Sequence, residues 1–184
     1  MAKSRSDLRV MIDANILIAG SVWPRWPYEV LEHAQRGDFK LVLSSFIIEQ
    51  ARRHINRRFA SGRARFERFL AVARYELIAE LPVEELKGFF GLTRDPTDVP
   101  IAAAAIRAGA SYLISEDKDL TTHDDSTTRL RQQVAVLLSG TFLREVMGWS
   151  SDQLLTGTSK SKLMSSDVII LSARFPLSVV TERG

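Results

Sequence analysis

The amino-acid sequence predicts an α/β fold built on a mainly parallel sheet. Short apolar segments that are typical of buried strands alternate along the chain with segments whose apolar residues recur at helical spacing. Gly37, Pro82 and Gly109 stand where one segment ends and the next begins. Because strands that alternate with helices favour crossover connections, most of the strands should be parallel. A chain of 184 residues is expected to form one domain with room for additional segments.

The composition is that of an ordinary globular protein and excludes several kinds of chemistry. Hydrophobic residues make up 45% of the chain and charged residues 26%. The absence of cysteine excludes disulfides, zinc–thiolate sites and cysteine nucleophiles, and it fits a reducing cytosol. Asp13 and Asn15 interrupt the first apolar run, and no stretch has the roughly 18 apolar residues of a membrane span. We therefore expect a cytoplasmic protein without membrane contact.

The first strand is predicted at Leu8–Ile12, an apolar run bounded by polar residues. Residues 22–27 are predicted to form a loop because two prolines flank its tryptophans. Tyr28–Arg36 follows as an amphipathic helix that Gly37 ends, since glycine adopts the left-handed terminal conformation without strain. Phe39–Leu43 is the second predicted strand.

The middle of the chain is predicted to be mostly helical. Ser44 and Ser45 can cap a helix that runs to Arg57 or Arg58. Phenylalanine, leucine and alanine at helical spacing predict a second helix over about Ala64–Ala79, and Pro82 opens a short acidic helix, Val83–Phe90. The Asp-Pro-Thr-Asp turn at 95–98 then leads into the alanine-rich helix Val99–Ala108.

The last third supplies two further strands and then changes in composition. Tyr112–Ser115 and Val134–Leu138 are the predicted third and fourth strands, and Phe142–Met147 is the last predicted helix. Ser, Thr, Lys and Gly then crowd the chain, before the apolar runs Val168–Leu171 and Phe175–Val180. We expect a domain over residues 8–149 and a Ser/Thr-rich tail over 150–184 that is weakly ordered and docks at most one strand or short helix.

Four acidic residues are predicted to meet at one edge of this sheet. Each follows a predicted strand directly or lies in the first turn of a predicted helix: Asp13, Glu49, Asp98 and Asp117. In parallel sheets the carboxyl ends of the strands share an edge with the helix N-termini that follow, and ligands bind there. Converging carboxylates repel one another unless a cation lies among them. Because Mg²⁺ takes oxygen ligands and keeps waters for chemistry on phosphates, the cluster indicates a metal-dependent enzyme acting on phosphodiesters.

Each of these acids also has an ordinary structural explanation. Asp13 and Asp98 could be helix N-caps, Glu49 could be favoured by the helix dipole, and Asp117 could belong to a solvated turn. Four neighbours are candidate accessory residues that orient a carboxylate, bond a bound water or form the turns: Asn15, Asp95, Ser115 and Asp119. Glu116 is expected to point away from the cluster, because side chains alternate along a strand.

A basic segment begins directly after Glu49. Eight arginines and only one acid, Glu67, lie between residues 52 and 74. Arginine binds phosphates through bidentate hydrogen bonds, so contact with a nucleic-acid backbone is the functional interpretation, and a solvated helix face is the alternative. The candidate nucleic-acid contacts are Arg52, Arg53, Arg57 and Arg58. Trp23, Trp26 and Tyr28 are candidates for an exposed aromatic patch, or they pack beneath the loop.

The order of these motifs closely resembles the PIN domain, in particular the small prokaryotic PIN toxins of toxin–antitoxin pairs. The resemblance rests on Val10-Met11-Ile12-Asp13-Ala14-Asn15, on Glu49, on Asp95-Pro96-Thr97-Asp98 and on Ser115-Glu116-Asp117-Lys118-Asp119. It implies a three-layer α/β/α sandwich and a Mg²⁺- or Mn²⁺-dependent endoribonuclease. Asp13, Glu49, Asp98 and Asp117 match the family's acidic cluster, which binds the metal. A small antitoxin and a homodimer are also implied.

The sequence departs from the family pattern in two places. Glu116 stands where the family commonly has glycine, and residues 150–184 have no counterpart in such toxins. These departures motivate a rival interpretation, a catalytically weak or inactive module that binds RNA or protein. A phosphatase of the haloacid dehalogenase type would need an Asp-x-Asp motif, but Asn15 occupies the third position. A receiver domain would need paired acids after the first strand, where only Asp13 is found.

Overall fold

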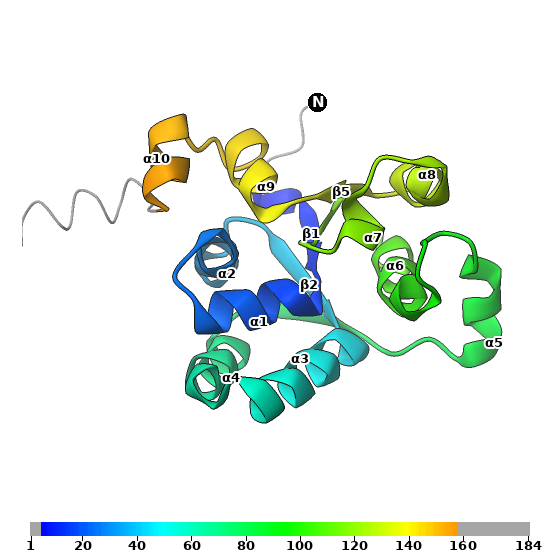
Figure 1. The fold of residues 1–184 in the computed structure, drawn as a ribbon, viewed down its shortest axis with the longest axis horizontal. Helices are drawn as coiled ribbons and strands as arrows, with labels where there is room; N and C mark the ends of the chain where they lie inside the picture. Colours follow the sequence, from blue (N-terminus) through cyan, green and yellow to red (C-terminus); the bar gives the residue numbers. More distant parts are fainter. Residues whose placement is uncertain (1–4, 158–184) are drawn as a thin grey trace, which may run out of the picture.

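A computed structural model describes residues 5–157 and places a five-stranded parallel sheet between two layers of helices (Figure 1). The strand order is β3-β2-β1-β4-β5, and every pairing is parallel. This confirms the predicted α/β class and the three-layer sandwich. The strands are β1 (Arg9–Ile12), β2 (Lys40–Ser44), β3 (Tyr75–Ile78), β4 (Tyr112–Ile114) and β5 (Ala135–Leu137).

The connections place helices on both faces of the sheet. From β1 the chain moves outward to β2 and β3, then crosses back to β4 and β5 on the other side of β1. Because parallel crossovers are right-handed, this reversal puts the helices of the two halves on opposite faces. The first half contributes α1 (Ala14–Val22), α2 (Trp26–Arg36), α3 (Ser45–Arg58) and α4 (Arg63–Val72). The second contributes α5 (Val83–Leu86), α6 (Val99–Arg107), α7 (Lys118–Thr121) and α8 (Asp125–Arg131).

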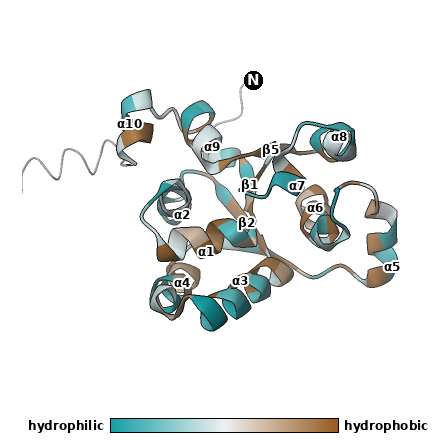
Figure 2. Cartoon of the chain, in the orientation of Figure 1, coloured by the Kyte–Doolittle hydropathy of each residue, from teal (hydrophilic) through white to brown (hydrophobic). Residues whose placement is uncertain are grey.

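The core lies on both sides of the central strands. Val10, Met11 and Ile12 of β1 are completely buried, as expected for a strand that helices cover on both faces. The alanine-rich helix α6 presents small buried side chains, which allow it to approach the sheet closely. Hydrophobic colour concentrates on the strands and on α6, whereas the C-terminal half of α3 is hydrophilic (Figure 2).

The prediction of one long helix over Ala64–Ala79 is wrong. Helix α4 ends at Val72, and Tyr75–Ile78 form β3, an edge strand paired with β2. A guanidinium from β1 supports this edge, because Arg9 Nη1 lies 2.7 Å from Glu76 Oε2. A short apolar run after a helix is compatible with the repeat of apolar residues in a helix and with that in a strand. Here the pairing with β2 decides its conformation.

Other boundaries shift by a few residues. Helix α2 begins at Trp26 because Pro27 is accommodated in its first turn, and α1 extends to Val22, so the predicted loop is shorter by three residues. Helix α9 is Ser139–Glu145, which starts three residues before its predicted position. Four 3₁₀ helices accompany these elements: η1 (Arg5–Asp7), η2 (Ala60–Gly62), η3 (Lys87–Phe89) and η4 (Pro96–Asp98).

The beginning of the predicted tail forms a helix. Ser150 opens α10 (Ser151–Thr156) with a reciprocal capping box to Gln153, and Leu154 O accepts a hydrogen bond from Trp26 Nε1 at 2.9 Å. The predicted apolar runs Val168–Leu171 and Phe175–Val180 lie outside the described residues. Every helix among the described residues is too short or too polar to cross a membrane.

Candidate metal and nuclease site

The candidate site lies at the carboxyl ends of β1 and β4, where the strand order reverses. The chain leaves β1 toward one side of the sheet and reaches β4 on the other, which makes this the topological switch point where α/β sheets bind ligands. Asp13 follows β1 directly, and its backbone N–H bonds Ile114 O of β4 at 2.9 Å. Asp117 follows β4 after two residues. The sheet therefore brings these two predicted acids together.

Asp13 is buried, with 4% of its surface exposed, and its carboxylate is held by three donors. Oδ1 accepts from the backbone N–H of Ala14, and Oδ2 accepts from Asn15 Nδ2 and Ser115 Oγ, both at 2.7 Å. Asp13 is also the N-cap of α1, which confirms the capping interpretation, and a role in a metal-binding cluster stays a prediction. Burial raises its pKa to about 6, against the opposing effect of the hydrogen bonds from Ser115, Ala14 and Asn15.

Ser115 connects the two strand ends. Its hydroxyl donates to Asp13 and accepts from Asn15 Nδ2 at 3.1 Å and from the backbone N–H of Asp117 at 3.0 Å. The one donor and two acceptor positions of the Ser115 hydroxyl are therefore all occupied by hydrogen bonds. Asn15 Oδ1 in turn accepts from the backbone N–H of Glu116 at 3.2 Å. The predicted accessory residues Asn15 and Ser115 therefore fix the position of Asp13 relative to the turn that carries Asp117.

The turn after β4 is closed by carboxylate capping. Asp117 is the N-cap of α7, and its Oδ1 accepts from the backbone N–H of Asp119 at 2.9 Å. Glu116 points away, as predicted from strand alternation. Its carboxylate accepts hydrogen bonds from the backbone N–H and the hydroxyl of Ser139, at the start of α9. The side chain that replaces the family's usual glycine therefore leaves the acidic cluster.

Asp98 supplies the third carboxylate of the cluster. It opens α6, but its side chain makes no capping hydrogen bond, so its oxygens are not used by the helix. Its pKa is raised to about 7, first by burial and then by the negative charges of Asp117, Asp13, Asp95 and Asp119. Asp95 instead caps the turn before α6 through Thr97 N at 2.8 Å, an interaction that lowers the pKa of Asp95. Asp13, Asp98 and Asp117 thus share one electrostatic environment.

Glu49 lies on a neighbouring element and has a different partner. It is exposed on α3, and its Oε1 lies 3.0 Å from Arg52 Nη1. It is not among the five largest influences on the pKa of Asp98 or of Asp13. A role for Glu49 in the cluster therefore stays a prediction.

The four predicted nucleic-acid-binding arginines divide into two groups. Arg52 bonds both carboxylate oxygens of Glu67 and also Glu49, which neutralises its charge. Arg53, Arg57 and Arg58 are exposed and line a hollow of about 230 Å³ along α3, and none of them forms an ion pair with another described residue. The second group is the one available to bind phosphate.

Sequence reasoning missed Arg94, which lies at the rim of the acidic cluster. Its Nε is 3.6 Å from Asp119 Oδ1, and its side chain is largely exposed. An isolated arginine next to a turn carries no sequence signal, because only the folded turn brings it to Asp119.

The donors of the cluster are those that a hard divalent cation prefers. They are carboxylate oxygens. Burial and then the charges of neighbouring carboxylates raise the pKa values of Asp13 and Asp98, and a bound cation would offset the repulsion between these charges. Within residues 5–157, however, no three His, Asp or Glu side chains are arranged to hold one ion together. The chemistry of the cluster therefore fits a metal, and its side chains would have to adjust to ligate one.

Comparison with known proteins gives the family. Residues 9–119 match the family model described as PIN domain, which is more than half of the chain. The chain belongs to the PIN-domain family. This confirms the family prediction, and PIN domains are generally nucleases, a class of hydrolase. The chain has no match among curated proteins.

Solved structures share the fold of this PIN domain. PAE2754 from Pyrobaculum aerophilum is 13% identical, with a TM-score of 0.53 and coverage of 80% of this chain and 100% of that one. VapBC2 from Rickettsia felis, solved bound to a DNA fragment from its promoter, is 17% identical, with a TM-score of 0.50 and coverage of 71% and 98%. At these identities the likeness shows a common fold.

Proposed function

We propose that this PIN domain is a divalent-metal-dependent endoribonuclease and the toxin component of a toxin–antitoxin pair. The observation that carries the proposal is the shared electrostatic environment of Asp13, Asp98 and Asp117 at the topological switch point. Carboxylates that raise one another's pKa without a nearby cation are typical of sites that function with a bound ion.

Asp13, Asp98 and Asp117 would hold Mg²⁺ or Mn²⁺. A bound cation would lower the pKa of a water molecule and offset charge on the scissile phosphate. Asn15 and Ser115 keep Asp13 oriented, and Asp119 lies beside Asp117 where it can contact a water. Glu49 would join the site through a bound water. Alternatively, it would break its ion pair with Arg52 when the substrate binds and then join the site directly.

The exposed arginines of α3 would position the RNA backbone without reading bases. Arg53, Arg57 and Arg58 can each bond a phosphate, because no described carboxylate pairs with them. Arg52 would contribute only after leaving Glu67 and Glu49. Among the four arginines predicted from sequence, we therefore assign phosphate contact first to these three.

The proposed partners follow from the family resemblance and from the charge of the site. A small antitoxin would neutralise the nuclease, and a basic side chain of the antitoxin would find a partner in the acidic cluster. VapBC2 of Rickettsia felis, which shares the fold, is a complex bound to promoter DNA, and this supports an antitoxin that also binds DNA. We further propose a homodimer and a cytoplasmic location.

The first test is cleavage of labelled total RNA by the purified full chain. We expect discrete cleavage with Mg²⁺ or Mn²⁺, and loss of cleavage with EDTA and in the Asp117→Asn variant. Asparagine keeps an oxygen that can cap Asp119, so the variant should remain folded by circular dichroism. The matched control is Asp125→Asn, which alters an exposed acid in the first turn of α8 and should leave cleavage unchanged. Equal cleavage by Asp117→Asn and the parent protein would contradict the assignment of the site.

A second candidate function is a non-catalytic module that binds RNA or protein. Two observations favour it: Glu49 is paired with Arg52, and no three His, Asp or Glu side chains of residues 5–157 are arranged to hold one ion. In that case folded protein would leave the RNA intact in every lane, while RNA binding would persist in EDTA.

A further inference from the structure

Three aromatic rings contact one another in a row beside the arginine-lined hollow of α3, and the middle ring, that of Phe59, is half-buried. The ring of Phe59, at the end of α3, lies 5.7 Å from that of His54 at an interplanar angle of 30°. Trp23, at the end of α1, meets Phe59 edge-on at 5.1 Å. His54 and Trp23 are exposed, Trp23 by 45%. We call Trp23, His54 and Phe59 the aromatic row.

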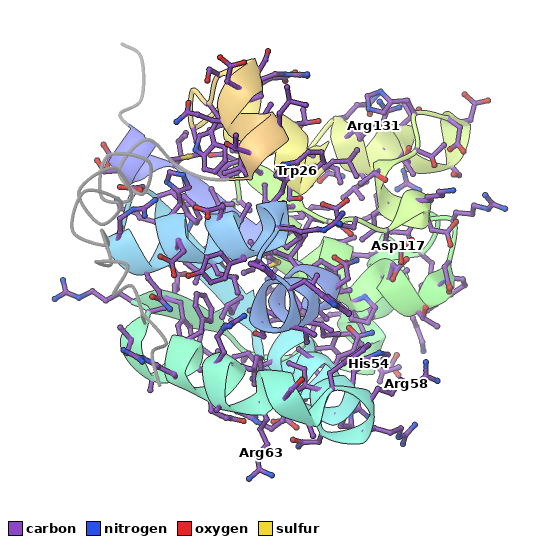
Figure 3. The ribbon with its side chains drawn as sticks, turned by 60° about the vertical axis from the view of Figure 1, so that its left-hand side comes forward. Trp26, His54, Arg58, Arg63, Asp117 and Arg131 are labelled. Carbon is purple, nitrogen blue, oxygen red and sulfur yellow. The ribbon has the colours of Figure 1, made fainter. Side chains whose placement is uncertain are left out.

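The row begins in one hollow and ends at another. His54 lines the hollow of about 230 Å³ together with Arg53, Arg57 and Arg58. Trp23 lines a second hollow of about 340 Å³ whose walls include Arg25 and Pro27. In Figure 3, His54 and Arg58 lie together, with Asp117 above them in the same view. Each end of the row therefore lies in a hollow that is also lined by arginine, and none of Arg53, Arg57 and Arg58 forms an ion pair with a described carboxylate.

We propose that the aromatic row and the α3 arginines bind single-stranded RNA leading to or from the acidic cluster. The inference rests on the proposed nuclease function and names the side chains that would hold the unpaired bases of the strand. Single strands are held by positive grooves that follow the backbone and by aromatic side chains on which unpaired bases stack. Arg53, Arg57 and Arg58 provide the first feature, and the aromatic row provides the second.

The position of the row fits a strand that passes through the acidic cluster. Helix α3 starts directly after β2, the neighbour of β1, and Glu49 lies in its N-terminal part. From Glu49 to Arg57 the helix rises about 12 Å, at 1.5 Å per residue. A short run of nucleotides bridges that distance. Bases of a duplex are stacked on their neighbours and cannot lie on the rings, so duplex RNA should be excluded from the row.

A buried acceptor in the same hollow is also without a donor. Gln50 lines the hollow, and its Oε1 has no hydrogen-bond partner among the described residues although that atom is shielded from solvent. If the Gln50 side chain turns toward the hollow, a ribose hydroxyl or a base amino group would supply the missing donor. The carboxylate of Glu67, which neutralises Arg52, does not line the hollow.

The experiment measures binding in EDTA, so that it does not depend on the metal or on catalysis. The full chain is titrated into a fluorescein-labelled, unstructured oligoribonucleotide and into a duplex of the same length, and anisotropy is recorded. We expect Trp23→Ala to weaken single-strand binding by about 5-fold or more, the loss associated with one base–aromatic stack. Trp23→Phe should retain most of the affinity because it keeps a ring. The duplex should bind more weakly and should not respond to Trp23→Ala.

Two matched variants control for general effects. Trp26 is as exposed as Trp23, at 43%, but lies against α10, so Trp26→Ala should leave binding unchanged. Arg57→Ala should reduce the slope of log affinity against log salt by about 0.7, the value for one phosphate contact on a single strand. Arg129→Ala, on α8 across the sheet, should leave that slope unaltered.

Three binding results would overturn the inference. The first is unchanged single-strand binding in Trp23→Ala. The second is a loss of single-strand binding in Trp26→Ala that equals the loss in Trp23→Ala. The third is a loss of duplex binding in Trp23→Ala that equals its loss of single-strand binding. A change of oligomeric state in Trp23→Ala with RNA binding intact would assign the row to contact between copies of the chain and overturn it as well. Cleavage with Mn²⁺ is measured separately. If the protein cleaves RNA but Trp23→Ala does not weaken single-strand binding, only this inference is contradicted. If Trp23→Ala weakens single-strand binding but the protein does not cleave RNA, only the proposed nuclease function is contradicted.

Discussion

A single hydroxyl, that of Ser115, organises the acidic cluster. It is completely buried, and all of its hydrogen-bonding capacity is directed at Asp13, Asn15 and Asp117. Asp13 bears a charge in a buried position, so its orientation depends on the donors that surround it. Ser115 is thus a positioning residue whose loss should affect the cluster without removing a carboxylate.

We expect Ser115→Ala to lower cleavage and to destabilise the fold by about 1–3 kcal/mol, because buried partners lose a hydrogen bond. Urea unfolding gives the stability and RNA cleavage gives the activity. Ser115→Thr keeps the hydroxyl and should recover part of the activity. Full activity in Ser115→Ala would show that Asp13 does not need this donor.

At this scale the sequence predicts most of the cluster but not its rim. Asp13, Asp98 and Asp117 are predictable because each stands at a strand end or at the start of a helix. The strand order then brings these positions to the same edge of the sheet. Arg94 is not predictable, since its contact with Asp119 depends on the shape of the turn before α6. The partner of Glu49 is equally hidden, because only the fold shows that Arg52 pairs with both Glu49 and Glu67.

Among the elements, α9 depends on a cap from another segment. Its N-cap position is Leu138, which has no side-chain acceptor, and Glu116 supplies the acceptor for the backbone N–H of Ser139 at 3.1 Å. The turn after β4 therefore carries two carboxylates with different tasks. Asp117 faces the cluster, and Glu116 stabilises the start of α9.

We expect Glu116→Ala to cost about 0.5–2 kcal/mol of stability, as the loss of a helix cap does. Cleavage by the folded variant should remain unchanged, because Glu116 points away from the cluster. Glu116→Gln keeps an oxygen acceptor and should lie between the variant and the parent protein in urea unfolding. A strong loss of cleavage in Glu116→Ala at unchanged stability would contradict this division of tasks.

Elements with strong periodicity are predictable from the sequence, and edge elements are not. The central strands are continuous apolar runs, and α3 has the predicted serine cap at its N-terminus. Strand β3 is half exposed, so its pattern resembles the end of the preceding helix until its pairing with β2 is known. Helix α8 contains only two buried residues in seven and carries little apolar periodicity.

For the whole molecule, the raised pKa values of Asp13 and Asp98 link stability to pH. The folded chain binds the protons of the Asp13 and Asp98 carboxyl groups more tightly than the unfolded chain does. In the unfolded chain the pKa of each group is close to its ordinary value of 3.8. The resulting stabilisation is complete below that value and is lost as pH rises through about 6 for Asp13 and about 7 for Asp98. The groups that face Asp98 are Asp117, Asp13, Asp95 and Asp119, all of the same sign.

We therefore expect Mg²⁺ or Mn²⁺ to raise the melting temperature more near pH 7.5 than near pH 5, because protons compete with the cation at the lower pH. Thermal unfolding with and without metal at both pH values measures this difference. In Asp98→Asn the difference should shrink, since one titrating group is gone. An equal shift at both pH values would place the bound ion outside the acidic cluster.

The distance along the chain between Asp13 and Ser115 has a consequence for how the protein is made. The two residues are 102 positions apart, yet their side chains share a hydrogen bond in the finished fold. During synthesis the N-terminal part emerges first, so Asp13 and Asn15 leave the ribosome long before the segment that orients them. A nascent chain that stops short of β4 also lacks Asp117. A chain assembled in this order has no complete acidic cluster until β4 and the turn after it have emerged from the ribosome.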